Sequence, residues 1–268
     1  MVPRVAAFLA VSVGLLGAGP AAALSLSAIV SIKAGTAGMG ANDAPNCQIV
    51  VTDTSVIVCT TAAGEAKAQV GFGVLRGLAD TTGTPLSSLH QAAAVTGFSE
   101  TVVVTGATSG TFRATILLTG QVSVGSGVTN TAGFLRSDWA GAQLIEATGD
   151  ATVLSASNTQ VNWSFDENSA GAFAESMTVE WSFTSGAPLI LGSTLSVSAL
   201  LGGLVLDFFN TVVVDGFEGF DGDGNPVELE IRGPGGELLA TAVPEPTIAG
   251  LLGLAALAGL AVARPRRP

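Results

Sequence analysis

Histidine and cysteine are almost missing from this chain of 268 residues, which contains one histidine, His90, and two cysteines, Cys47 and Cys59. A Ser-His-Asp or Cys-His catalytic site would have to use His90, and the chain has no Gly-x-Ser-x-Gly elbow. A zinc-type site needs several His or Cys ligands close together, and His90 has no such neighbour. We therefore expect His90 to be a surface or capping residue, and we expect no enzymatic site, metal or other cofactor.

Basic residues are also scarce. Between Leu24 and Val243 six lysines and arginines stand against twenty aspartates and glutamates, a net charge of −14. Such a surface repels nucleic acid and anionic lipid, so nucleic acid is excluded as a partner. The same charge favours solubility.

Between residues 24 and 242, a convincing helical pattern and internal repeats of fixed period are lacking as well. Short apolar runs instead alternate with polar residues and are separated by Gly, Asn, Asp and Ser, a pattern typical of β-strands. The run 66–76 predicts one strand. The run 111–124 places Phe112, Ile116 and Leu118 on one side and predicts one long strand or a strand pair. About eleven or twelve strands predict a single all-β domain over residues 24–242, an antiparallel β-sandwich of jelly-roll type.

Two hairpins are predicted inside this domain. Residues 48–58 provide two apolar arms around a polar centre, and residues 161–165 and 177–183 alternate around the loop 166–172. The second hairpin carries Trp163 and Trp181 in register with Val, Met and Phe, which favours core packing for both rings. Trp139 lies in a stretch without clear alternation of apolar and polar residues, so both core packing and a sugar-stacking role remain open for it.

The two ends of the chain carry targeting signals. Arg4 precedes the apolar segment 5–16, a Gly/Pro break and Ala21–Ala23, which is typical of a secretory signal peptide over residues 1–23. Residues 247–263 form an uncharged run of seventeen residues, the short end of a membrane-spanning helix. The sequence therefore predicts an N-terminal signal helix and a C-terminal transmembrane helix on either side of the β domain.

The flanks of the apolar run are equally informative. Pro244, Glu245 and Pro246 precede it, and Arg264, Arg266 and Arg267 follow it. The arginines hold their end in the cytoplasm, which places the Pro-Glu-Pro motif at the outer face of the inner membrane. The fixed φ of the two prolines makes this motif extended and accessible. An anchor that is never cut remains the simpler alternative.

Together these three parts resemble a PEP-CTERM sorting signal over residues 243–268. The resemblance implies recognition and cleavage near the motif by an exosortase, a membrane peptidase of diderm bacteria. It also implies a mature protein at the cell surface or in the extracellular matrix, with a link to exopolysaccharide and biofilm. Because export exposes the chain to an oxidising compartment, we expect a disulfide between Cys47 and Cys59 across the open end of the first hairpin.

Several acidic residues are candidates for catalysis or for Ca²⁺ binding. Paired carboxylates could cut glycosidic bonds, but the pairs Asp166–Glu167, Glu175–Glu180 and Glu228–Glu230 fit solvent-exposed positions on strands and loops. The run 221–225 resembles the start of an EF-hand loop but lacks its later ligands, so Asp221, Asp223 and Asn225 predict a turn or at most a weak Ca²⁺ site.

The sequence thus favours a secreted, non-enzymatic β-sandwich protein that an exosortase sorts to the cell surface. A lectin-like polysaccharide-binding module is the first alternative, and an exposed row of aromatic residues would favour it. An envelope hydrolase is the second, and two converging carboxylates in a cleft, or His90 beside a serine, would favour that.

Overall fold

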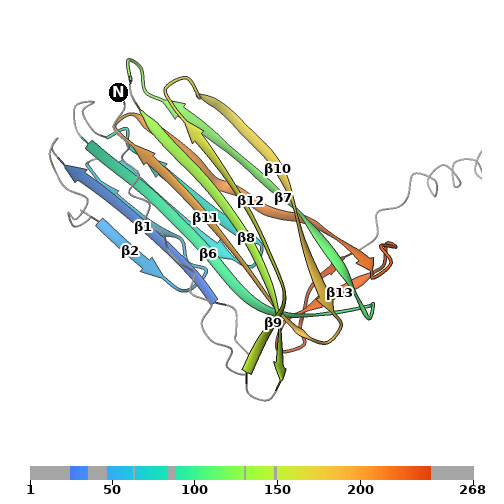
Figure 1. The fold of residues 1–268 in the computed structure, drawn as a ribbon. Coiled ribbons are helices and arrows are strands. Elements are labelled where there is room, and N and C mark those ends of the chain that lie inside the picture. Colours follow the sequence, from blue (N-terminus) through green and yellow to red (C-terminus); the bar gives the residue numbers. More distant parts are fainter. Residues whose placement is uncertain are drawn as a thin grey trace, which may run out of the picture.

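The structure is a computed structural model that describes residues 25–35, 47–62, 64–83, 89–129, 131–147 and 150–242. The described part contains fourteen strands and no helix, and every strand pair in it is antiparallel. The strands form two sheets that lie as two layers (Figure 1). The predicted all-β class with a sandwich-like arrangement is confirmed, while the expected helices at 1–23 and 247–263 lie outside the described residues.

The larger sheet has eight strands. Its main path runs through β14 (Leu238–Ala242), β13 (Leu229–Arg232), β6 (Leu89–Thr105), β11 (Pro188–Leu200), β8 (Ala132–Ala147) and β9 (Asp150–Phe165). Two further strands lie off this path: β1 (Ser25–Gly35) pairs with β6, and β2 (Cys47–Val51) pairs with β1.

The smaller sheet has six strands. Its order is β10 (Gly171–Thr184), β7 (Ser109–Val124), β12 (Leu204–Asp221), β5 (Val74–Asp80), β4 (Gly64–Gly71) and β3 (Ile57–Thr61).

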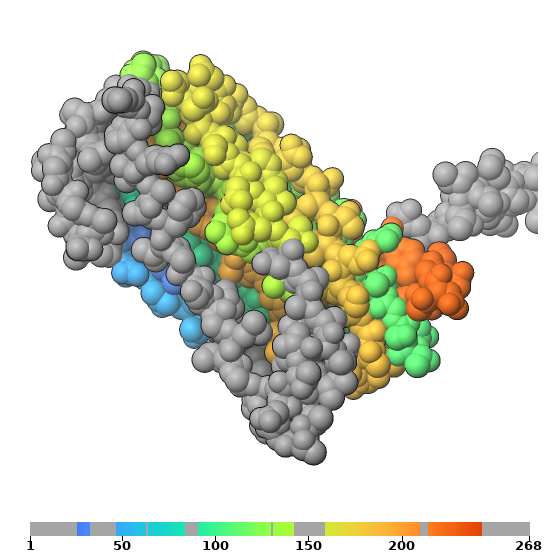
Figure 2. Space-filling view, in the orientation of Figure 1, coloured from blue at the N-terminus to red at the C-terminus, as the bar shows by residue number. Residues whose placement is uncertain are grey.

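Strand β6 organises the larger sheet because it has two successive neighbours along one edge. Strand β1 pairs with it as far as Ser99, and β13 pairs with it from Val103 onward. The sheet therefore changes neighbour at residues 100–102. The hairpin of β13 and β14 continues the sheet at the end of the molecule opposite β2 (Figures 1 and 2).

The inner faces of the two sheets form one apolar core. Strands β7 and β11 alternate buried and more exposed residues along most of their length, as the period-two pattern requires. Phe112, Ile116 and Leu118 are fully buried, which confirms the predicted core side of residues 111–124. That stretch is the single strand β7, so the alternative of a strand pair is wrong.

The first predicted hairpin is wrong. Strand β2 pairs with β1 in the larger sheet, whereas β3 pairs with β4 in the smaller sheet. Residues 52–56 therefore carry the chain from one layer to the other. A short polar connection between two alternating strands looks the same in sequence for a hairpin and for such a crossing.

The second predicted hairpin fails for the same reason. Strand β9 pairs with β8, and β10 pairs with β7 in the opposite sheet. Phe165 of β9 and Phe173 of β10 meet edge-to-face across the interior, with ring centroids 5.7 Å apart. The two strands thus face each other through their side chains instead of their backbones.

Two further differences concern strand limits. The run 66–76, expected to be one strand, is divided between β4 and β5 by a turn at Phe72 and Gly73, and Gly73 has a φ of +67° that suits glycine. Strand β8 and the first part of β9 were not predicted. Gly, Ala and Ser occur throughout this region, so its apolar alternation is weak.

Candidate functional site

The predicted sorting signal lies outside the described residues. This holds for Pro244, Glu245 and Pro246, for the apolar run 247–263, and for Arg264, Arg266 and Arg267. The predicted signal peptide 1–23 lies outside them as well. Within the described stretches between residues 25 and 242, no helix is long and apolar enough to span a membrane.

The predicted disulfide between Cys47 and Cys59 is present. Its Cα atoms are 6.1 Å apart, and Cys59 is buried while Cys47 is half-buried against the core. Because Cys47 begins β2 and Cys59 lies in β3, the bond joins the two sheets. It therefore fixes the edge of one layer to the edge of the other, instead of closing a hairpin.

We expect exported protein to contain no reactive thiol. A maleimide reagent added to denatured, unreduced protein should leave the mass unchanged, and the same treatment after reduction should add two labels, because the cysteines are Cys47 and Cys59 alone. Labelling of both cysteines without reduction would contradict the cross-sheet bond.

The acidic pairs weighed in the sequence lie at the surface, as expected. Glu180 forms an ion pair with Arg113 of the neighbouring strand, and Glu228 is exposed. Asp166 accepts hydrogen bonds from the hydroxyl of Ser169 (2.8 Å) and the backbone N–H of Asn168 (3.0 Å), and these bonds lower the pKa of its carboxyl. These contacts are those of a sheet surface and a polar turn.

The loop after β12 is a closed turn. One oxygen of the Asp221 carboxylate accepts the backbone N–H groups of Asp223 (2.9 Å) and Asn225 (2.8 Å), and the other accepts the Asn225 side-chain amide (3.1 Å). The side chain of Asn225 is the main cause of a lowered pKa at Asp221. Both oxygens are thus engaged inside the turn, and the weak Ca²⁺ site stays a prediction.

The three tryptophans differ in exposure. Trp139 and Trp181 are 2% and 3% exposed, whereas Trp163 is half-buried and packs edge-on against Phe173 with centroids 5.5 Å apart. Core packing is confirmed for Trp181, and the question left open for Trp139 is settled in favour of the core. Its indole N–H donates to the hydroxyl of buried Ser137 at 3.0 Å.

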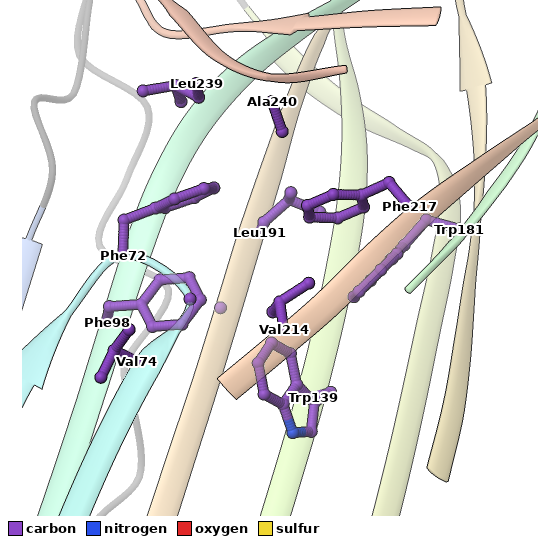
Figure 3. A pocket seen from close by; sticks show the side chains of 12 residues that line it. Phe72, Val74, Phe98, Trp139, Trp181, Leu191, Val214, Phe217, Leu239 and Ala240 are labelled. Atoms are coloured by element: carbon purple, nitrogen blue, oxygen red, sulfur yellow. The ribbon is translucent and has the colours of Figure 1, made fainter. Parts of the chain in front are cut away.

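A cavity of about 200 Å³ lies between the two sheets. Figure 3 shows Phe98, Trp139 and Leu191 of the larger sheet around it, together with Trp181 and Phe217 of the smaller sheet. The turn between β4 and β5 and strand β14 complete the wall. None of the described residues that line it is charged, so the space is suited to apolar contents.

Trp181 owes its place in this wall to a glycine. A Cβ atom on Gly141 of β8 would overlap the five-membered ring of Trp181. The indole ring also stacks on Phe112, with centroids 5.1 Å apart. The indole N–H of Trp181 is buried without a hydrogen-bond partner among the described residues.

Glu100 is a buried carboxyl outside the acidic pairs that the sequence pattern singles out. It is 4% exposed because, like Phe98 and Val102, it lies on the side of β6 that faces the core. Burial, followed by the negative charge of Glu237, raises the pKa of Glu100 to about 7. This carboxyl can therefore hold or release a proton near neutral pH. The sequence signal for its burial was its position in the alternating pattern, two residues from Phe98 and two from Val102.

The remaining candidates form no joint site. The backbone of His90 pairs with Ala34 at the start of β6, and its side chain is not among those described. In the described part of the chain, no three His, Cys, Asp or Glu residues are placed to hold a metal ion. A scan against protein-family models finds no match, and no curated protein matches this chain.

Proposed function

We propose that this chain is an exported surface or matrix protein whose delivery is directed by an exosortase-type peptidase. The observation that carries the proposal is the order of three parts in residues 243–268: the Pro-Glu-Pro motif, the uncharged run and the arginine cluster. A rigid motif at the outer membrane face, a barely sufficient span and charges held in the cytoplasm together suit a removable anchor.

The body of the protein is consistent with this delivery. A disulfide is typical of proteins that reach an oxidising compartment. The last described strand, β14, ends at Ala242, so Val243 alone separates the sheet from the motif. The acidic surface is repelled by anionic lipid and favours departure from the membrane once the anchor is cut.

The finer fold class belongs to the same proposal. From β5 to β12 the chain passes repeatedly between the two sheets, with only β8 and β9 consecutive in one layer. This alternation supports a jelly-roll-like sandwich. In the proposed role the sandwich is a stable, non-enzymatic component of a matrix that contains exopolysaccharide.

Trp139 and Trp181 were two of the three possible sugar-stacking residues of the polysaccharide-binding alternative. Both are buried and cannot stack on a sugar in solvent, which weakens that alternative. The hydrolase alternative gains no observation from the described carboxylates. We therefore retain sorting to the surface as the proposed function.

The sorting step is testable with Glu245→Ala in a host that contains the peptidase. Glu245 is the charge of the motif, so its loss should leave an uncut species in the inner membrane, about 2 kDa heavier than the mature protein because it keeps a tail of roughly twenty residues. Mass spectrometry of the surface and membrane fractions measures the mass of the protein in each fraction and so identifies the cut and the uncut species. Glu228→Ala, which removes an exposed glutamate from the body, is the matched control and should be processed normally.

An exported protein that retains the peptide ending at Pro268 would overturn this proposal and leave a permanent anchor.

A further inference from the structure

The cavity between the sheets is lined by residues from widely separated parts of the chain. Phe72 belongs to the turn between β4 and β5, Trp139 and Trp181 come from opposite sheets, and Ala240 is in β14. Figure 3 shows the Ala240 side chain directed from β14 toward the other lining groups. The cavity is thus a partly open pocket whose wall comes from both sheets and from the turn between β4 and β5.

Water is a poor filling for an apolar pocket of this size, because the lining atoms lack the contacts that a packed interior would give them. Apolar cavities of about 150 Å³ stay free of water and accept benzene. The present cavity is larger, at about 200 Å³, and its wall is mostly aromatic and aliphatic. It therefore has room for a substituted ring or a short branched chain.

The charges nearby limit what can enter. Glu100 lies two residues beyond Phe98 on the same inward face of β6, and Glu237 adds negative charge near it. A second anion brought between the sheets would be repelled and would lose its water without gaining a partner.

We propose that this cavity is a binding site for a compact, uncharged apolar molecule, such as a single substituted aromatic ring. The site is independent of the sorting proposal, because all of its described lining residues lie between Phe72 and Ala240, in the body of the protein. Aromatic faces supply the contact area, and the acidic surroundings reject carboxylate analogues of the same shape.

The test uses bromobenzene and the full chain held in lipid nanodiscs. Bromine quenches indole fluorescence on contact, and all three tryptophans lie outside the apolar run 247–263, so probe dissolved in lipid contributes little. We expect a saturable loss of fluorescence from Trp139 and Trp181. The anion 4-bromobenzoate, which adds a carboxylate to the same ring, should give no saturable loss at pH 8.

Two variants of β14 form the matched pair. Ala240→Phe fills the cavity and should abolish the saturable quenching, whereas Leu238→Phe changes a residue of the same strand that is 53% exposed and should leave it intact. Circular dichroism checks that each variant is folded. If Ala240→Phe does not fold, Val214→Leu fills the space less drastically and should weaken the quenching in the same direction.

Purely linear quenching of the wild type would overturn the site, and so would saturable quenching that survives in the folded filling variant. Equal binding of bromobenzene and 4-bromobenzoate would overturn the assignment to uncharged ligands.

Discussion

Replacement of Trp181 by alanine should lower the free energy of unfolding by about 3–5 kcal/mol, the range for deletion of a fully buried large aromatic side chain. Trp181 is 3% exposed, stacks on Phe112 and lies against Gly141 of the opposite sheet. Its removal therefore withdraws contacts from both layers at once. Urea unfolding followed by circular dichroism measures the effect without relying on indole fluorescence.

Trp163→Ala is the control for this prediction. Trp163 is a tryptophan of the same interior but half-buried, so its truncation should cost less, about 1–2 kcal/mol. From sequence alone the two tryptophans would be assigned the same cost, because both alternate with polar residues. Equal losses for the two variants would contradict the difference in burial seen in the structure.

Glu100→Gln should stabilise the protein at pH 8 by about 2–3 kcal/mol and have little effect at pH 4. The folded-state pKa of Glu100 is raised to about 7 from an ordinary value of 4.5. The folded state therefore binds the proton more tightly than the unfolded state. The stability associated with this proton is fully present below pH 4.5 and is lost as the pH rises through about 7.

The measurement is the difference between variant and wild type in urea unfolding at several pH values from 4 to 8, since the other titrating groups cancel in that difference. Glu228→Gln removes a carboxyl at an exposed position and should produce no comparable pH-dependent difference. A constant difference between Glu100→Gln and wild type across the range would show that the carboxyl does not change its ionisation on folding.

The alternation of apolar and polar residues determined which side of each recognised strand faces the core. Residues 111–124 show this well, because the apolar side predicted for them is the buried side of β7. Composition and the two targeting patterns likewise led to an all-β body with a disulfide between Cys47 and Cys59, and both are present. These features are local, since each depends on the spacing of residues within one stretch.

The pairing of strands was decided by the tertiary structure. Period two specifies a face but not a hydrogen-bond partner, and a short polar connection serves a hairpin and a crossing between layers equally well. Strands β2 and β3 were therefore expected side by side in one sheet, as were β9 and β10, and each pair is divided between the two sheets.

The interior chemistry also depended on this assembly. Glu100 occupies an inward position where β6 changes neighbour from β1 to β13, and its raised pKa comes from burial and from Glu237, more than a hundred residues later in the chain. Side chains of both sheets line the cavity. One of them is Trp139, for which the sequence did not decide between the core and the surface. Sequence spacing determines which groups point inward, but only the packing of two sheets decides which of them meet.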